Sequence, residues 1–333
     1  YTFFKGVISL RGTKYKILTL LKQSKAIVSG ESLAKELKVS RTAIWKSIRD
    51  LEKLGYQIEH LANGYRFLSS NVLEAEEIAF DPLLAENIFI EKQTDSTMNA
   101  AKVAGMNQQA TPALFLTETQ TSGRGRYGRP FFSPEGQIYM TLLLEPNRTF
   151  EEIPQYTLLT AVAVASAIDE ETGKSCSIKW VNAIFLDGKK VCGILSEAMS
   201  DFETGQISHV TIGIGLNFAI PNEQFPEELQ SVATSLFPEG TPTITRNELI
   251  QKIWRNFFEL LEGLPDTTYL DYYRNKSFVI GKVVHFTRRG TTYSGKALRI
   301  SDSGELIVQT TAGEMTLSSG EISLSKIDGK QLK

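Results

Sequence analysis

The stretch Thr117-Glu-Thr-Gln-Thr-Ser-Gly-Arg-Gly-Arg-Tyr-Gly-Arg129 follows a short apolar run at residues 113–116. The apolar run is typical of a buried strand, so the sequence predicts a strand that ends in a loop. Glycines in this loop let the backbone approach a ligand closely, and each arginine offers a fork of donors that matches phosphate or carboxylate. The pattern favours a flap that closes over an anion. A solvated or nucleic-acid-binding Gly-Arg segment is the alternative.

The length and composition indicate several globular domains. At 333 residues the chain exceeds the usual size of one core, and a hydrophobic fraction of 41% suits soluble domains. No apolar run is long enough to span a bilayer, and no signal-peptide pattern opens the printed sequence. Cys176 and Cys192 are too few for a disulfide framework or a zinc cluster. We therefore expect a cytoplasmic protein with reduced cysteines, no membrane partner and no bound structural metal.

The charge is distributed unevenly along the chain. Residues 1–70 contain 13 Lys and Arg against 5 Asp and Glu, which gives +8. The chain as a whole has a net charge of −2, so the remaining residues carry −10. A basic amino-terminal module on an acidic body indicates a polyanionic partner for that module.

The amino-terminal module has the pattern of a winged helix-turn-helix. Helical spacing at residues 14–22 is followed by two helices that Ser29 and Ser40 begin as N-caps. The short turn between these two helices fits a helix-turn-helix. Alternating strands at residues 56–60 and 64–68 flank Asn63-Gly64, which is a strong hairpin pattern.

In such a module the third helix enters the major groove by its amino-terminal end. The candidate DNA-binding residues are therefore Ser40, Arg41, Thr42, Trp45 and Lys46. Hydroxyl groups suit phosphates, whereas Arg and Lys also reach guanine edges. On the wing, Asn63 and Arg66 are placed to touch the DNA backbone. A protein-docking winged helix is the alternative, and Trp45 also fits a core position.

The central region mixes strand pairs with flanking helices, which argues for an α+β fold. Residues 69–80 fit a linker and a short acidic helix. Strands are expected at 137–144 and 209–218, helices at 155–171 and 247–263, and a hairpin over 177–195 that turns at Asp187-Gly188. The glycines of Gly213-Ile-Gly-Leu-Asn217 permit close backbone approach, although strand packing or a bulge explains them equally well.

A further helix is expected to begin at Asp95-Ser-Thr-Met-Asn99 and to run through Val103. Either Asp95 or Ser96 would cap it, and the free N–H groups of its first turn favour an anion. The hydroxyl groups of Ser96 and Thr97 are suited to a polar ligand group. A plain N-cap is the alternative explanation.

The carboxyl-terminal region predicts a small all-β barrel of SH3-like size. Short strands are expected at 283–287, 293–300, 306–309 and 315–318, with turns at Arg289-Gly290, Ser303-Gly304 and Ala312-Gly313. No catalytic constellation occurs here, so docking or a lid role is expected. The prediction for the full chain is an α+β multidomain protein with a winged helix-turn-helix at 1–70, a central mixed α/β domain at 71–276 and an SH3-like β-barrel at 277–333.

Together these motifs resemble the bifunctional biotin protein ligase and biotin-operon repressor family. The resemblance extends from about Lys14 to Leu324. Its specific motifs are Gly123-Arg-Gly-Arg-Tyr-Gly-Arg129, Lys179-Trp-Val-Asn182 followed by Lys189-Lys-Val-Cys-Gly193, and Gly213-Ile-Gly-Leu-Asn217. The resemblance implies that biotin and ATP give biotinyl-5′-AMP, from which biotin passes to a lysine of a biotin carboxyl carrier protein. It also implies a homodimer, loaded with biotinyl-5′-AMP, that binds biotin operator DNA.

The resemblance also implies roles for individual residues of the ligase domain. Lys190, Arg124 and Arg126 would be catalytic, and Mg²⁺ would accompany ATP with Asn182 on the metal side. The nucleotide would contact Arg126, Arg129, Phe131, Asn182 and Asn217. Biotin would contact Ser96, Thr97, Met98, Gln120, Arg124, Gly125, Arg126, Trp180 and Lys190.

Two positions depart from the family pattern Lys-Trp-Pro-Asn-Asp. Val181 replaces the proline, and Ala183 replaces a carboxylate expected near ATP and Mg²⁺. A second hypothesis is therefore a biotin-sensing repressor that binds biotin and DNA without turnover. A lipoate ligase is less favoured, because the winged helix accompanies biotin enzymes in this family.

Overall fold

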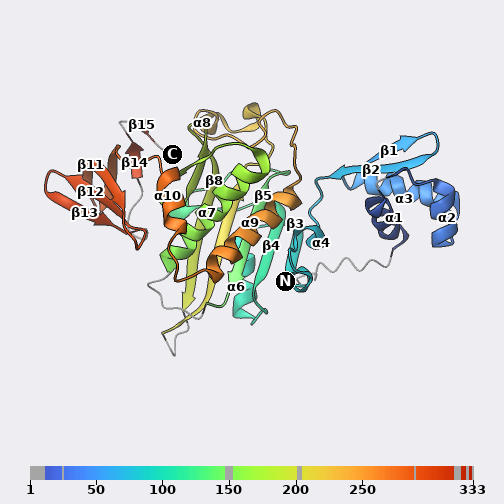
Figure 1. Ribbon diagram of the computed structural model, residues 1–333, viewed down its shortest axis with the longest axis horizontal. Coiled ribbons are helices and arrows are strands. Elements are labelled where there is room, and N and C mark those ends of the chain that lie inside the picture. The colour runs from blue at the N-terminus through green and yellow to red at the C-terminus, as the bar shows by residue number, and fades with distance from the viewer. Residues whose placement is uncertain are drawn as a thin grey trace.

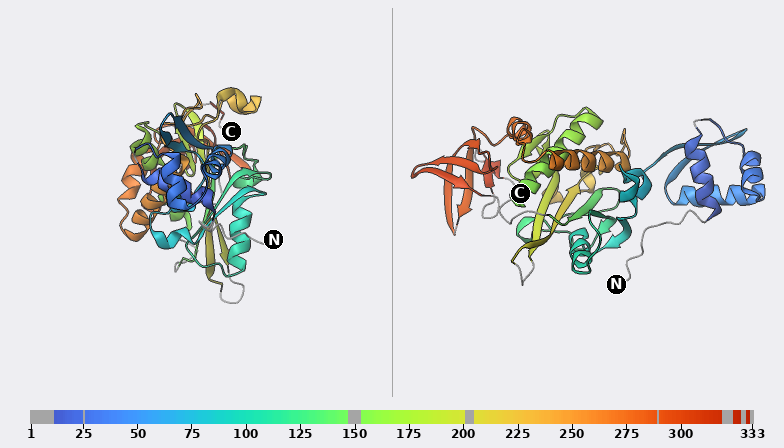
Figure 2. Two further views of the ribbon diagram at one scale, coloured as in Figure 1. Left: turned by 90° about the vertical axis from the view of Figure 1, so that its right-hand side faces the viewer. Right: turned by 60° about the horizontal axis from the view of Figure 1, so that its bottom comes forward.

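The computed structural model describes residues 12–24, 26–146, 153–200, 205–288, 290–318, 324–327 and 330–331. Three parts follow one another in space as they do in the sequence (Figure 1). The amino-terminal helices and hairpin lie at one end, a large sheet covered by helices lies in the middle, and a small β domain lies at the other end. The right-hand view in Figure 2 shows the same order of the three parts. The residue boundaries of the three domains stay a prediction.

The amino-terminal part is a winged helix. Helices α1 (Thr13–Gln23), α2 (Gly30–Leu37) and α3 (Arg41–Lys53) precede the hairpin of β1 (Tyr56–Leu61) and β2 (Gly64–Ser70). Ser29 and Ser40 cap α2 and α3, since their side chains accept from the backbone N–H groups of Ser32 and Ala43. Leucine and isoleucine side chains of all three helices form one small core with β1. The predicted caps, helices and hairpin are confirmed here.

A seven-stranded sheet organises the central part. Its strands are ordered β3-β4-β5-β9-β8-β7-β6, and only β3 and β4 are parallel among its described pairs. The bounds are β3 (Ile88–Thr94), β4 (Ala113–Gln120), β5 (Ile138–Leu144), β6 (Ser177–Lys179), β7 (Ala183–Leu186), β8 (Lys189–Ser200) and β9 (Ile207–Leu216). Helix α6 (Thr97–Met106) makes the crossover between the two parallel strands, as that connection requires.

Helices cover both faces of this sheet. Side chains of β5 alternate, so Met140 and Leu142 join the core with α7 (Ile153–Thr172) and α9 (Arg246–Glu262), whereas Leu143 joins the core beneath α6. In Figure 1, α7 and α9 lie side by side along the sheet, and they contact each other. The other helices in the described part of the chain are the short segments α4 (Ala75–Ile78), α5 (Pro82–Ala85), η1 (Arg126–Gly128), η3 (Asn222–Gln224) and α8 (Glu227–Gln230), together with α10 (Tyr269–Lys276).

The predicted hairpin over residues 177–195 is wrong in one respect. The turn at Asp187-Gly188 is present, and both residues have the left-handed φ values, 50° and 78°, of a tight two-residue turn. A second turn at residues 180–182 divides the first strand into β6 and β7, which pair antiparallel. Alternation of the side chains gave no sign of this second turn.

The carboxyl-terminal part is an antiparallel sheet of the SH3-like kind. Its strands are β10 (Val283–Arg288), β11 (Thr291–Ile300), β12 (Leu306–Thr310), β13 (Gly313–Leu317), β14 (Leu324–Ile327) and β15 (Lys330–Gln331). They are ordered β13-β12-β11-β10-β14-β15. The four predicted strands are therefore present, whereas Arg289 of the first predicted turn lies outside the described residues.

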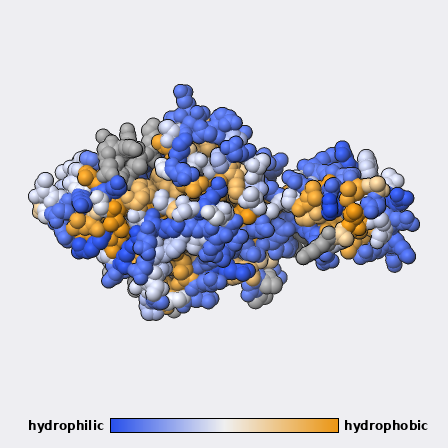
Figure 3. All heavy atoms as spheres, turned by 45° about the horizontal axis from the view of Figure 1, so that its top comes forward, coloured by the Kyte–Doolittle hydropathy of each residue, from blue (hydrophilic) through white to orange (hydrophobic). Residues whose placement is uncertain are grey.

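The described surface is mostly hydrophilic on the face in Figure 3, with hydrophobic patches over both end domains. None of the described helices has the length and apolar character needed to cross a membrane.

Candidate active site

A pocket of about 220 Å³ lies above the carboxyl ends of β4 and β9 and the start of β8. Elements far apart in the sequence meet there, including the start of α6, the loop at residues 123–129 (the Gly-Arg flap) and the turn before β7. Twelve of the thirteen site residues predicted in the central domain line it. These are Ser96, Thr97, Met98, Gln120, Arg124, Gly125, Arg126, Arg129, Phe131, Asn182, Lys190 and Asn217.

Glycines keep the floor of the pocket open. Gly213 and Gly215 of β9 pair with Thr141 and Tyr139 of β5. A Cβ atom on Gly213 would stand 2.7 Å from the sulfur of Met98, and one on Gly215 would stand 2.6 Å from the ring of Phe131. Distances this short do not occur between packed atoms, so side chains at these positions would displace the pocket walls. Close approach, rather than a bulge, therefore explains these two glycines.

The first turn of α6 forms the polar end of the pocket. Ser96 is the N-cap residue, but its side chain makes no capping hydrogen bond. Asp95 Oδ1 instead accepts from the Ser96 backbone N–H at 2.6 Å, and Gln120 Oε1 accepts from the Thr97 backbone N–H at 3.0 Å. The hydrogen bond from Asn99, followed by that from Ser96, lowers the pKa of Asp95 against the effect of burial. The buried Ser96 hydroxyl therefore makes no capping hydrogen bond to the helix. The explanation that this side chain serves only as an N-cap is wrong.

The flap is held by its own hydrogen bonds. The Gly125 N–H donates to the Arg129 carbonyl oxygen at 2.8 Å, and the Phe131 N–H donates to the Gly123 carbonyl oxygen at 2.9 Å. At its tip, Tyr127 adopts a left-handed φ of 59°, a conformation that is uncommon for a bulky side chain. The flap therefore stands as a defined loop whose three arginines are grouped at the pocket.

Five basic side chains line the pocket, and no Asp or Glu occurs among its described lining residues. The basic residues are Arg124, Arg126, Arg129, Lys179 and Lys190. Burial, and then the charges of Lys190, Arg129 and Arg126, lower the pKa of Lys179 to about 7. Burial also lowers the pKa of Lys190, whose ammonium group lies 6.0 Å from the centre of the Phe131 ring. Such a cluster is suited to an anionic ligand.

The pocket contains a cysteine that is unsuited to covalent catalysis. Burial raises the pKa of Cys192 to about 12, so its sulfur is a neutral thiol near pH 7. The thiol is fully buried and donates weakly to the Gly193 carbonyl oxygen. Cys192 therefore serves as a small packing residue.

Trp180 lies outside this pocket, which corrects the prediction that it lines the biotin site. Its indole N–H donates to the Gly304 carbonyl oxygen of the carboxyl-terminal domain at 3.0 Å. The Tyr273 hydroxyl donates to the next carbonyl oxygen, that of Val181, at 3.0 Å. The ring is a buried anchor, and the turn at 180–182 carries Lys179 and Asn182 into the pocket instead.

The residues around Asn182 do not fit a metal site held by the protein. Mg²⁺ prefers oxygen ligands that include one or two carboxylates. No group of three His, Cys, Asp or Glu among the described residues is placed to hold a metal. Ala183 lines the pocket where the family pattern has a carboxylate. The Asn182 amide nitrogen donates to the Ile194 carbonyl oxygen at 2.6 Å, and only the amide oxygen could coordinate a cation.

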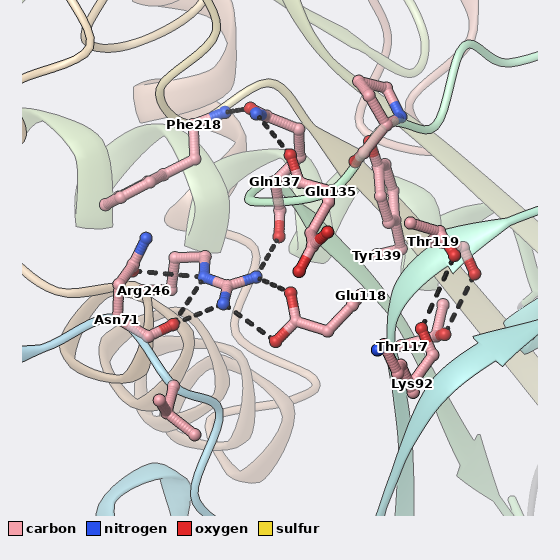
Figure 4. Close-up of polar contacts among 12 residues, drawn as sticks. Asn71, Lys92, Thr117, Glu118, Thr119, Glu135, Gln137, Tyr139, Phe218 and Arg246 are labelled. Atoms are coloured by element: carbon pink, nitrogen blue, oxygen red, sulfur yellow. Dashed lines mark hydrogen bonds and ion pairs between the residues drawn. The ribbon is translucent and has the colours of Figure 1, made fainter. Parts of the chain in front are cut away.

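Beside the pocket, a buried arginine joins the flap strand to the interdomain linker (Figure 4). Arg246, the first residue of α9, donates to both carboxylate oxygens of Glu118 on β4, at 2.7 and 2.9 Å. It also donates to the Gln137 carbonyl oxygen at 2.9 Å and to Asn71 directly after β2. Gln137 in turn accepts from the N–H group of Phe218, next to Asn217. Glu118 lies two residues before Gln120, so this network supports the base of the flap.

Sequence patterns missed these supporting residues and one wall of the pocket. That wall consists of Phe225, Leu229, Val232 and Ala233 around α8. Apolar residues scattered through an irregular segment give no periodic pattern. The segment is held beside β8 by a hydrogen bond from the Lys190 N–H to the Val232 carbonyl oxygen, and these two residues are far apart in the sequence. Arg246 had no distinguishing context in the sequence either.

On the winged helix, all five candidate DNA-binding residues are exposed at the start of α3. Ile44, Ile48 and Leu51 occupy its buried side. Trp45 is 53% exposed, so the core alternative for Trp45 is wrong. On the wing, Arg66 donates to the Glu59 carboxylate at 2.8 Å, which ties it to the neighbouring strand.

Known protein families match all three parts of the chain. The Biotin/lipoate A/B protein ligase family matches residues 90–217, an HTH domain matches residues 13–66, and the Biotin protein ligase C terminal domain matches residues 279–325. The class defined by the fold and the pocket is therefore a biotin/lipoate-type protein ligase that carries a helix-turn-helix domain.

Individual relatives narrow this class. The Bifunctional ligase/repressor BirA of Bacillus subtilis is 34% identical over 314 residues, which cover 89% of this chain and 94% of that protein. The protein of the same name from Escherichia coli is 25% identical and is covered to 92%. A structure of the biotin protein ligase from Aquifex aeolicus with biotin and ATP has a TM-score of 0.62 and 28% identity, covering 72% of this chain and 98% of that one. The chain belongs to the bifunctional biotin protein ligase and repressor family, and the α+β fold and the family resemblance are confirmed.

Proposed function

We propose that this protein joins biotin to AMP and then transfers biotin to a lysine of a biotin carboxyl carrier protein. One observation carries the proposal: a polar recess at the start of α6 continues into a cluster of five basic side chains, three from the Gly-Arg flap and two from the sheet. A biotin molecule has the matching polarity, with a polar ring at one end and a carboxylate at the other. The solved Aquifex aeolicus relative is described in complex with biotin and ATP, which supports this assignment.

The basic side chains of the pocket would offset the repulsion between the two anionic reactants of the first step. A biotin carboxylate oxygen attacks the α-phosphorus of ATP, the bond to pyrophosphate breaks, and a mixed anhydride forms. Both reactants are anions that repel each other, so preorganised cations in a water-poor site lower the barrier. Lys190, Arg124 and Arg126 are the groups that we assign to this charge. Lys190 would contact the biotin carboxylate.

The remaining pocket residues receive binding roles. Ser96, Thr97, Met98 and Gln120 would hold the biotin ring, with Gly125 beside it. The nucleotide would lie against Arg126, Arg129, Phe131, Asn182 and Asn217. The flap would cover the anhydride and exclude water, which would otherwise hydrolyse it. In the second step the acceptor lysine amine attacks the acyl carbon, the bond to AMP breaks, and the amine loses a proton.

Magnesium would enter with the nucleotide. The described pocket has no carboxylate to hold the ion, so we infer that ATP phosphate oxygens and water supply most of its ligands. Asn182 as a metal ligand stays a prediction.

The winged helix would give the protein its repressor function. Five exposed groups at the start of α3 and the +8 charge of residues 1–70 support binding to operator DNA. We infer that the operator has two half-sites, that the adenylate-loaded protein binds it as a homodimer, and that the protein acts in the cytoplasm.

The ligase function is tested with labelled biotin, MgATP and a biotin carboxyl carrier domain. Label is expected on one acceptor lysine, and replacement of that lysine by arginine is the control. Absence of label at saturating MgATP would refute the ligase function.

A repressor that senses biotin without turnover is the second candidate. The observation that favours it is Ala183, which leaves the described pocket lining without a carboxylate. Such a protein would bind biotin and release no pyrophosphate. Pyrophosphate release from the native protein and from Ala183→Asp separates the two candidates, because the sensing repressor predicts release only from the variant.

A further inference from the structure

Thr141 lies directly beneath the polar end of the pocket. The alternation of β5 turns Thr141 toward α6, on the same face as Leu143. Its side chain is fully buried, and Thr141 Oγ1 donates to Thr97 Oγ1 at 2.8 Å. Thr97 lines the pocket, whereas Thr141 is one layer below the lining. Thr141 therefore acts on a ligand only through Thr97.

The Thr97 hydroxyl has one hydrogen-bonding position left for a ligand. A hydroxyl group has one hydrogen to donate and two lone pairs to accept with. Thr97 Oγ1 accepts from Thr141, and its hydrogen points to Gln120 Oε1 at 3.4 Å. One lone pair remains, so Thr97 presents an acceptor to the pocket.

The hydrogen bonds of the Gln120 amide nitrogen determine that the Gln120 amide oxygen, and not the nitrogen, faces Thr97. Gln120 Nε2 donates to Ser133 Oγ at 3.1 Å, and Ser133 Oγ donates to the Phe131 carbonyl oxygen at 2.9 Å. A carbonyl oxygen only accepts, so Ser133 must donate there and accept from Gln120. The Gln120 amide oxygen then faces Thr97, where it also accepts the backbone N–H at 3.0 Å. The chain from Thr141 to Phe131 thus has one consistent direction of donors.

We propose that Thr141 is a positioning residue that sets the Thr97 hydroxyl as an acceptor and thereby selects a ligand ring with an N–H donor. The proposal rests on the proposed function, in which the cyclic urea of biotin supplies that N–H. A dithiolane ring of the lipoyl type has no N–H group to offer. Without Thr141 only the long contact with Gln120 Oε1, at 3.4 Å, orients the Thr97 hydroxyl. The hydroxyl then rotates more readily, and in the rotated orientation its hydrogen opposes the ligand's own donor.

The test replaces Thr141 with valine, which has nearly the same shape and no hydroxyl. Titration calorimetry with biotin alone is expected to show a Kd about tenfold higher, about 1.4 kcal/mol. Desthiobiotin keeps the cyclic urea without the sulfur ring, so it should lose the same factor. The kcat and the KM for MgATP should stay unchanged, and Thr141→Ser should restore biotin affinity.

Thr117→Val is the matched control. Thr117 is also fully buried, on the adjacent strand β4, and its hydroxyl donates to the Thr119 carbonyl oxygen at 3.0 Å, away from the pocket lining. Its loss should lower thermal stability and leave biotin affinity intact. Native affinity in Thr141→Val, or an equal loss in both variants, would overturn the proposal.

Ser133→Ala tests the same chain from a half-buried position, should Thr141→Val fail to fold. It is expected to raise the biotin Kd severalfold, and native affinity in this variant would also overturn the proposal. A native protein that gives no heat with biotin would instead refute the proposed function, and this proposal with it.

Discussion

Individual charged groups carry the chemistry of the pocket, and the ionisation of Lys179 changes near neutral pH. Burial and neighbouring cations lower its pKa from 10.5 to about 7. Between these values the unfolded chain binds the proton more tightly than the folded chain. The free energy of unfolding should therefore rise as the pH increases from about 7 to about 10.5.

Binding of MgATP should raise the lowered pKa of Lys179 again. A bound phosphate favours the charged form of Lys179, so binding at pH 8 is expected to take up part of a proton, and affinity should fall as the pH rises above about 7. Calorimetry of MgATP binding in two buffers with different ionisation enthalpies measures this uptake.

Lys179→Arg is the control for this experiment, because arginine stays protonated throughout the range. Its proton uptake at pH 8 should be close to zero. Equal uptake by the native protein and the variant would assign the proton to another group.

The flap and the glycine strand β9 act together as one unit. The Phe131 ring rests against Gly215, where an added Cβ would stand 2.6 Å away. We expect Gly215→Ala to push Phe131 and the flap base outward and to raise the KM for MgATP at least tenfold. Steady-state adenylation measures this change.

Gly263→Ala is the matched control for Gly215→Ala. Gly263 ends α9 with a helical φ of −66°, and a Cβ there would make only ordinary contacts at 3.5 Å. Native kinetics are expected. If Gly215→Ala also retained native kinetics, close packing of Phe131 on β9 would not govern the nucleotide site.

The same elements show what the sequence predicts well. Caps, the winged-helix hairpin and the turn at Asp187-Gly188 depend on residues within a few positions of one another, so local patterns specified them. Trp180 was misplaced because its partner, Gly304, lies 124 residues away and contributes only a carbonyl group. Thr141 and Arg246 were missed for the same reason, since their roles exist only after distant strands and helices meet.

The winged helix and the central domain are joined by contacts at the start of α9 and in the linker between the two domains. Arg246 holds the linker at Asn71, and Asn247 donates to the Val72 carbonyl oxygen at 2.8 Å and to Glu77 at 2.6 Å. Lys22 of α1 forms ion pairs with Glu74 and Glu77, at 2.7 and 2.6 Å. These ion pairs and hydrogen bonds attach the winged helix to the domain that contains the pocket.

DNA binding should depend on both of these domains. We expect affinity for a two-half-site operator to increase when biotin and MgATP are added, and Arg41→Ala to weaken it. Loss of one phosphate contact should reduce the salt slope by about 0.9 per chain. Gel-shift titration over a range of salt concentrations measures both quantities.

Lys53→Ala is the control for Arg41→Ala, because it removes one positive charge from α3 away from the proposed DNA contact. Lys53 is exposed at the opposite end of α3, where it pairs with Asp50 at 3.4 Å. Operator affinity should change little. If both variants lost affinity equally, general charge rather than contact at the start of α3 would account for binding.

The formation of an enclosed biotinyl-5′-AMP is tested most directly by mixing the protein with biotin and MgATP in the absence of acceptor. Rapid gel filtration followed by mass spectrometry then quantifies the nucleotide retained by the protein. The pocket and flap predict one biotinyl-5′-AMP retained and one pyrophosphate released per chain. Recovery of unchanged biotin and ATP, with no pyrophosphate, would contradict this function of the pocket.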